Sequence, residues 1–251
     1  MSGPVERWFE ARGWREFDFQ REVRQAYLAG ESGLVHSATG TGKTLAAFLG
    51  PAAEAFAEGA RKASPLRVLW ITPMRALAGD TAHSLERAAQ GVGLEWTVGL
   101  RTGDTPPAER ARQARRLPTV LVTTPESLAL MLSQAEARER LASVRAVVVD
   151  EWHELLGNKR GVQVELSLAR LRRWNPALRT WGLSATLGNL DEALTRLLAG
   201  APGRVVRGVS DKPVVIDTLI PADVGRIPWA GHLGLAMLPE VVAALEESRS
   251  T

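Results

Sequence analysis

Short apolar runs rich in β-branched residues alternate along this chain with longer segments in which apolar residues recur at helical spacing. The pattern predicts buried parallel strands joined by helices, as in an open, doubly wound α/β sheet with helices on both faces. The expected strands are 34–36, 68–71, 120–122, 146–149, 181–183, 205–206 and 214–216. The expected helices are 45–57, 76–89, 162–174, 191–199 and 239–247. Functional loops are then expected at the carboxyl ends of the strands.

The domain organisation follows from where this alternation weakens. Residues 57–65 and 102–118 are the least periodic, and we interpret both as surface connections, the second with a short basic helix. After residue 211, proline and glycine interrupt the pattern. With 251 residues there is room for one sizeable core but not for two full domains. We therefore expect one domain over 1–220 and a tail, 221–251, with one amphipathic helix.

The composition restricts the class of protein but identifies no functional site. The chain has no cysteine, no signal-like apolar start and no apolar run long enough to span a bilayer, so a soluble cytoplasmic protein is the default expectation, with no membrane partner. Its net charge is +3, and arginine supplies most of the 31 basic residues. Genomic codon bias explains this preference most simply, although an arginine-rich surface is also compatible with nucleic acid.

A phosphate-binding loop follows the first expected strand. It combines small residues, which let backbone N–H groups approach phosphate, with a cation and a hydroxyl that suit terminal phosphates and Mg²⁺. The segment begins at Ser37, where the usual pattern has glycine, and a helix is expected directly after it, so its positive end favours phosphate. The nucleotide-binding candidates in the loop are Thr39, Gly40, Thr41, Gly42, Lys43 and Thr44.

Two adjacent carboxylates, Asp150 and Glu151, close the apolar run 146–149. An isolated pair of this kind is usually a solvated turn, but its place at a strand end beside a loop that needs Mg²⁺ favours catalysis. We expect Thr44 and Asp150 to hold the metal, Glu151 to accept a proton from the attacking water or to orient it, and Lys43 to complete the catalytic set. The chain is thus predicted to be a nucleoside triphosphatase.

Two further polar segments stand near expected strand ends. Trp152 is expected in the core, whereas His153 fits a structural hydrogen bond and a functional role equally well. Ser184 and Thr186 flank an alanine after a strand-like run. Neither segment is informative alone, and their value lies in the order phosphate loop, Asp-Glu-x-His, Ser-Ala-Thr.

The ordered motifs resemble the first RecA-like domain of superfamily 2 helicases with a DExH box. Within that group, Asp-Glu-Trp-His-Glu-Leu-Leu-Gly from residue 150, followed by Lys-Arg-Gly from residue 159, is similar to the Lhr family, in its bacterial ligase-associated branch. The resemblance covers roughly residues 14–220 and implies a RecA-like P-loop fold. It also assigns Gln20 to adenine recognition.

The resemblance also implies a nucleic-acid track and a coupling set. Segments beginning at residues 72, 101 and 123 match the elements that contact the nucleic-acid backbone, although the third also fits a helix N-cap with a glutamate in its first turn. His153, Ser184 and Thr186 are implied to couple the two sites. The residues of the track are Pro73, Arg75, Thr102, Gly103, Thr123, Pro125 and Glu126.

What the family implies is an ATP- and Mg²⁺-dependent enzyme that moves 3′ to 5′ on single-stranded DNA and unwinds duplexes, including RNA–DNA hybrids, in DNA repair. Such an enzyme needs a second RecA-like domain with an arginine finger, which does not fit after Thr251. We therefore expect an N-terminal part that binds ATP but turns it over poorly.

Two other functions remain open. A stand-alone P-loop phosphotransferase would use the same loop, but it leaves Gln20, Arg75 and Thr102 unexplained. A non-catalytic module that binds nucleotide or DNA is disfavoured because Lys43, Thr44 and both carboxylates of the Asp150–Glu151 pair are intact.

Overall fold

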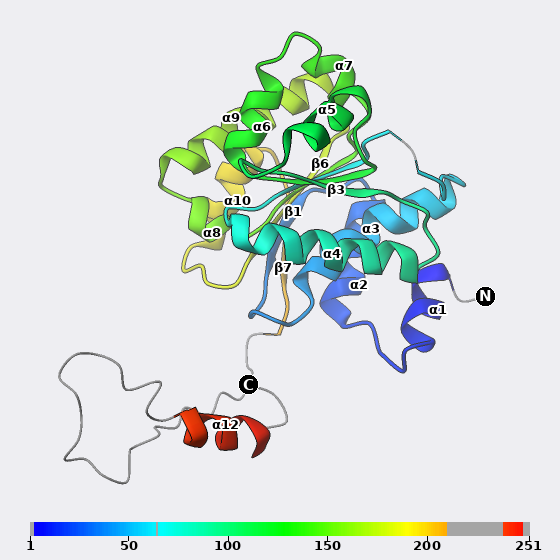
Figure 1. Cartoon of the computed structure of the whole chain (residues 1–251), viewed down its shortest axis with the longest axis vertical. Coiled ribbons are helices and arrows are strands. Elements are labelled where there is room, and N and C mark those ends of the chain that lie inside the picture. Colours follow the sequence, from blue (N-terminus) through cyan, green and yellow to red (C-terminus); the bar gives the residue numbers. More distant parts are fainter. Residues whose placement is uncertain (1–2, 64, 210–237, 248–251) are drawn as a thin grey trace, which may run out of the picture. The chain divides into compact units, whose positions relative to one another are not determined.

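The structure is a computed structural model of the whole chain, and it describes residues 3–63, 65–209 and 238–247 (Figure 1). The chain separates into two units, 1–211 and 212–251, each of which is described by itself. The expected boundary between residues 220 and 221 lies outside the described residues, as does the expected strand 214–216.

The first unit is built on a seven-stranded sheet in which every pair is parallel, as the sequence predicts. The strand order is β3-β4-β2-β5-β6-β1-β7. β3 was not among the expected strands, because its residues are only half-buried and include a glycine. The strands are β1 Gly33–His36, β2 Val68–Ile71, β3 Val98–Arg101, β4 Val120–Thr123, β5 Ala146–Val149, β6 Arg179–Ser184 and β7 Arg204–Arg207.

Helices cover both faces of this sheet (Figure 1). Alternate strand residues point to opposite faces, so Val35 and Trp70 belong to one hydrophobic cluster while Leu34 and Leu69 belong to the other. The first cluster includes α1 Pro4–Glu10, α2 Asp18–Leu28, α3 Lys43–Ala57 and α4 Arg75–Gly91. The second includes α6 Pro125–Leu132, α7 Ala137–Leu141, α8 Trp152–Leu155, α9 Lys159–Trp174 and α10 Leu190–Leu198.

The expected helices are present in the structure, whereas α1, α2, α7 and α8 were not among them. α3, α4, α9 and α10 match the expected segments within a few residues, and α5 Pro107–Arg115 is the short basic helix expected in the second connection. In the second unit, α12 Leu238–Glu247 matches the helix expected at 239–247. α6 begins after Thr124, whose hydroxyl accepts a hydrogen bond from the Ser127 N–H, so the N-cap interpretation of that segment is confirmed.

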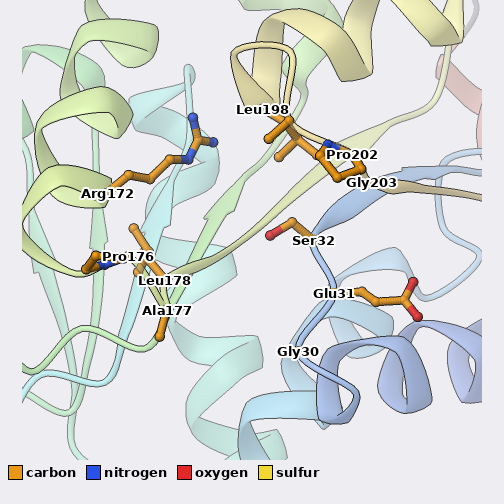
Figure 2. A pocket seen from close by; sticks show the side chains of 11 residues that line it. Gly30, Glu31, Ser32, Arg172, Pro176, Ala177, Leu178, Leu198, Pro202 and Gly203 are labelled. Carbon is orange, nitrogen blue, oxygen red and sulfur yellow. The ribbon is translucent and has the colours of Figure 1, made fainter.

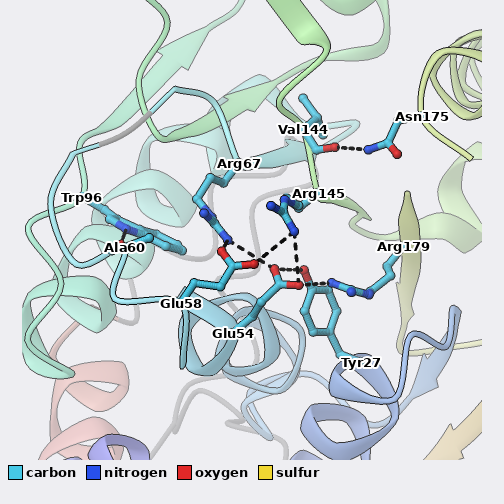
Figure 3. Close-up of polar contacts among 10 residues, drawn as sticks. All are labelled: Tyr27, Glu54, Glu58, Ala60, Arg67, Trp96, Val144, Arg145, Asn175 and Arg179. Atoms are coloured by element: carbon cyan, nitrogen blue, oxygen red, sulfur yellow. Dashed lines mark hydrogen bonds and ion pairs between the residues drawn. The ribbon is translucent and has the colours of Figure 1, made fainter. Parts of the chain in front are cut away.

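An ion-pair cluster closes the amino-terminal edge of the sheet (Figure 3). Arg67 and Arg145 precede β2 and β5, and Arg179 begins β6. All three guanidinium groups converge on the buried carboxylate of Glu54 in α3, which also accepts a hydrogen bond from Tyr27 Oη at 3.1 Å. α3 is thereby fixed against the strand starts, and the carboxyl ends of the strands face the loops that carry the predicted motifs.

Candidate functional site

Six motif segments follow six neighbouring strands at one edge of the sheet. Because all strands are parallel, their carboxyl ends lie together. The phosphate loop, the Ser-Ala-Thr segment and the Asp-Glu pair follow β1, β6 and β5, which we call the phosphate-loop half. The segments that begin at residues 72, 123 and 101 start at the carboxyl ends of β2, β4 and β3, which we call the opposite half.

The phosphate loop joins β1 to α3 in a compact turn. Gly40 and Gly42 have positive φ, +71° and +87°, a region that glycine enters without strain. The buried Lys43 ammonium group donates hydrogen bonds to the carbonyls of Ser37 at 2.7 Å and Ala38 at 3.2 Å. The lysine therefore already lies across the loop, where a cation can meet phosphate oxygens. Thr39 is exposed at the turn, and Thr44 is half-buried in the first turn of α3.

Ser37, which replaces the usual glycine, is held in place by hydrogen bonds. Its hydroxyl lies 2.7 Å from the Thr41 hydroxyl and donates to the Val209 carbonyl at 3.1 Å. The side chain fills space beside Gly208, where a Cβ would come within 2.5 Å of Ser37 Oγ. The serine side chain fits because the residue next to it, Gly208 after β7, has no side chain.

Gln20 connects α2 to the phosphate loop. Its side-chain oxygen accepts from the Phe17 N–H at 3.0 Å, and its amide nitrogen donates to the Gly42 carbonyl at 3.1 Å. Only 2% of the residue is exposed. Each end of the amide thus keeps one further hydrogen-bonding position, which is what recognition of a purine edge requires.

Asp150 is a half-buried carboxylate held by two donors. Trp70 Nε1 donates to Oδ2 at 3.1 Å and the Glu151 backbone N–H donates to Oδ1 at 3.0 Å. Burial and the neighbouring Glu151 raise the pKa of Asp150, while these hydrogen bonds and the charge of Lys43 act in the other direction. The net pKa lies above the ordinary value, and a bound cation would lower it. A carboxylate within reach of the Lys43 charge, beside a loop that also carries the Thr44 hydroxyl, supplies the oxygen ligands that Mg²⁺ prefers.

The turn after β5 is strained and directs two side chains together. Glu151 has a positive φ of +46°, which is uncommon for a residue other than glycine. His153 Nδ1 lies 3.4 Å from the Glu151 carboxylate and 3.2 Å from the Ser184 hydroxyl at the end of β6. The histidine therefore connects the Asp-Glu pair to the Ser-Ala-Thr segment. Thr186 is exposed, and Trp152 is in the core as predicted.

In the opposite half, the three segments contact one another. The Arg75 guanidinium group lies over Gly103 and pairs with Asp104 at 3.4 Å. Arg110 of α5 donates to the carbonyls of Thr102 and Gly103 and so fixes the loop after β3. Arg75 is exposed, and it brings a cation to this edge of the sheet.

Several predicted track residues are buried. The side chains of Pro73, Thr102, Thr123 and Pro125 pack inside the domain, and the Thr123 hydroxyl donates to the Arg101 carbonyl at 2.7 Å. Such residues shape the loops and offer a ligand only their main chain.

Glu126 is half exposed, but its carboxylate forms an ion pair with Arg160, whose guanidinium group donates a hydrogen bond to each carboxylate oxygen. Burial alone would raise the pKa of Glu126. The hydrogen bonds and charge of Arg160, together with a backbone N–H, bring it below its ordinary value instead. The carboxylate therefore remains ionised and paired.

Three residues of the site were not found from the sequence. Trp70 and Arg160 act through partners distant in the chain, and Arg110 lies in a segment interpreted only as a basic surface helix. The Lys-Arg-Gly run that contains Arg160 was noted as part of the family pattern, and this was the only signal for it.

A separate cavity of about 550 Å³ lies at the amino-terminal edge of the sheet, away from the motif segments (Figure 2). It is lined by the segments that precede β1, β6 and β7, with Ser32, Leu178 and Pro202 among its walls. None of the motif residues reaches it. The chemistry predicted from the sequence is therefore confined to the carboxyl ends of the strands.

Comparisons with known proteins agree with this arrangement. The DEAD/DEAH box helicase family profile matches residues 17–193. The Lhr helicase/probable uracil glycosylase of Mycolicibacterium smegmatis is 40% identical over 234 residues, which cover 88% of this chain and 15% of that protein. The ATP-dependent helicase Lhr-Core of Methanothermobacter thermautotrophicus is 39% identical over 78% of this chain and 24% of its own length.

A solved structure gives the same result in three dimensions. The structure of Mycobacterium smegmatis helicase Lhr bound to ssDNA and AMP-PNP aligns with a TM-score of 0.81 and 33% identity, over 98% of this chain and 32% of that one. This chain thus spans less than a third of the length of these relatives. The predicted RecA-like α/β fold is confirmed, and the chain belongs to the DEAD/DEAH box helicase family, with similarity to Lhr helicases over most of its length.

Proposed function

We propose that this chain is the ATP- and single-stranded-DNA-binding part of an Lhr-type DNA helicase. One observation carries the proposal: nucleotide motifs and backbone-contacting motifs occupy adjacent halves of one sheet edge, on neighbouring strands β5 and β2. A P-loop phosphotransferase would need only the phosphate-loop half. The Arg75–Gly103 contact and the presence of three motif segments in the opposite half would then have no purpose.

In the phosphate-loop half, each side chain has a role that its geometry supports. Lys43 and the loop N–H groups contact the phosphates, and Gln20 positions the adenine. Thr44 and Asp150 would hold Mg²⁺, which supplies charge neutralisation at the terminal phosphates when bound. Glu151 accepts or orients the proton of the attacking water, and His153 links that turn to Ser184 and, through its segment, to Thr186.

In the opposite half, the ligand that fits is a nucleic-acid backbone. Exposed Arg75 provides a cation, while Gly103 and the loops shaped by Pro73, Thr123 and Pro125 provide main-chain groups. Contacts of this kind bind phosphate and sugar, which gives affinity without sequence readout. The relative solved with ssDNA and AMP-PNP has this fold, which supports the assignment of both ligands.

The resemblance extends the proposal beyond the present residues. Translocation requires a second RecA-like domain that closes over ATP and supplies an arginine finger. The similarity to the ligase-associated branch favours 3′-to-5′ movement, activity on RNA–DNA hybrids and a role in DNA repair in the bacterial cytoplasm. In the described residues, no helix is long and apolar enough to cross a membrane.

The test is to measure Mg·ATP binding and ATP turnover by this chain, with and without single-stranded DNA. We expect binding with negligible turnover, because an arginine finger contributes roughly three to five orders of magnitude in P-loop enzymes. Lys43→Ala is the control and should abolish most of the binding. Brisk turnover stimulated by DNA would show that the chain completes its own site, and absence of binding would refute the proposal.

A further inference from the structure

Arg160 joins two loops of the opposite half. Its Nε donates to Glu126 Oε1 at 2.6 Å, and its Nη2 donates to Glu126 Oε2 at 3.3 Å and to the Pro73 carbonyl at 2.7 Å. Pro73 follows β2 and Glu126 lies in the first turn of α6 after β4. One guanidinium group therefore sets the spacing between the loops that follow two neighbouring strands.

The same residue is tied to the Asp150–Glu151 turn through a short, rigid connection. Directly after the turn comes α8, and the Asn158 side chain donates to the Glu154 carbonyl at 2.7 Å. The Asn158 oxygen accepts from the backbone N–H groups of Arg160 and Gly161 at 2.9 and 3.0 Å, which caps α9.

Close packing between α8 and α9 makes this connection rigid. A Cβ at Gly161 would overlap the Leu155 carbonyl, so the start of α9 lies directly against the end of α8. α8 itself is anchored by Trp152, whose indole N–H donates to the Ala193 carbonyl at 2.9 Å. A displacement of the Asp150–Glu151 turn therefore moves the base of Arg160, since packed elements shift as units.

We propose that Arg160 is a positioning residue that couples nucleotide binding at the Asp150–Glu151 turn to the geometry of the DNA-contacting loops. The inference rests on the proposed function. It assigns to Arg160 no contact with DNA or nucleotide. The fork of the guanidinium group is essential, because a single-point cation cannot hold both the Glu126 carboxylate and the Pro73 carbonyl.

The experiment uses the longer helicase that contains this chain. The affinity for a fluorescent oligothymidine is measured with and without Mg·AMP-PNP, at several salt concentrations, beside basal ATP turnover. In Arg160→Ala we expect ssDNA affinity with nucleotide to fall at least about fivefold and the effect of nucleotide to vanish, with KM for ATP within about twofold. Arg160→Lys should behave as Arg160→Ala does.

The salt dependence separates positioning from direct contact. Loss of a phosphate contact lowers the slope of log affinity against log salt by about 0.7 for single strands, whereas loss of positioning leaves it unchanged. A reduced slope would overturn the proposal. So would full nucleotide coupling in Arg160→Ala. The matched control is Arg173→Ala, an exposed arginine on the same helix, which should change none of these quantities.

Glu126→Gln provides a test of opposite sign. Simple electrostatics predicts that removing a negative charge strengthens DNA binding. Positioning predicts weaker binding, because the amide holds the guanidinium group less firmly. Tighter binding would overturn the proposal. If the wild-type protein bound no ssDNA, the proposed function would fail as well, whereas normal wild-type coupling that persists in the variants would refute only the role of Arg160.

Discussion

The Trp70 indole N–H donates a hydrogen bond to the Asp150 carboxylate at 3.1 Å, from β2 to the residue after β5. This contact crosses the boundary between the two halves of the site. Asp150 is half-buried, and partial desolvation is the main cause of its raised pKa, so each donor that reaches it helps to keep the carboxylate ionised. The tryptophan thus supports the charge of the carboxylate that we propose holds Mg²⁺, as well as packing in the core.

Trp70→Phe should destabilise the domain more than its loss of size explains. Trp181 provides the comparison, because Trp70 and Trp181 flank Val148 in register and both are buried. The Trp181 indole nitrogen has no hydrogen-bond partner in the described part of the chain. Trp70→Phe should therefore cost about 1–3 kcal/mol more than Trp181→Phe in urea unfolding. Equal losses would show that the bond to Asp150 contributes nothing.

Ser37 and Gly208 should behave as a size-matched pair. Gly208→Ala places a methyl group against the Ser37 side chain, and we expect a loss of about 1–3 kcal/mol with weaker nucleotide binding. Ser37→Gly in the same chain should recover most of that loss. Thermal unfolding of both single variants and the double variant measures the coupling. Additive effects would mean that the two residues do not share this space.

The sequence predicted most of the sheet and the position of the candidate nucleotide motifs at strand ends, for reasons visible in particular residues. Runs such as 146–149 are buried on both faces and therefore apolar throughout, whereas β3 is half-buried and has no such run. The Trp70–Asp150 and Arg160–Pro73 bonds could not be predicted, because each depends on which strands become neighbours. That order is fixed by the packing of the whole sheet, not by local pattern.

Glu151→Gln should separate binding from chemistry in the proposed full-length helicase. The amide keeps the size of the side chain but cannot accept a proton, so Mg·ATP affinity should stay within about threefold while turnover falls at least about a hundredfold. Isothermal titration and a phosphate-release assay measure the two quantities. Turnover close to that of the wild type would show that another group handles the proton.

Gln20→Ala should reduce the preference for ATP over GTP and weaken both. The preference falls because the amide no longer reads the purine edge, and overall affinity falls because the Gly42 carbonyl loses its donor. Competition between the two nucleotides for a fluorescent analogue measures both effects. An unmodified chain that binds ATP and GTP equally would remove the basis for adenine recognition by Gln20.

His36, the last residue of β1, should make stability depend on pH. Burial and the charges of Arg207, Lys43 and His153 lower its pKa in the folded chain, and its Nδ1 has no hydrogen-bond partner among the described residues. The unfolded chain therefore binds more protons over the interval between that lowered value and 6.5. The free energy of unfolding should therefore rise with pH through this interval. The contribution of His36 to it is lost as the pH falls through the interval.

His36→Gln should flatten this dependence, because the amide does not titrate. Between pH 5 and 8, the free energy of unfolding in urea should decline less on acidification in His36→Gln than in the wild type. The difference should correspond to the contribution of one histidine with a lowered pKa. His83→Gln, at an exposed position on α4, is the matched control and should leave the wild-type profile unchanged. A His36→Gln profile parallel to that of the wild type would mean that His36 is protonated equally in the folded and unfolded chains. The low-pH sensitivity would then have to come from other titratable groups of the domain.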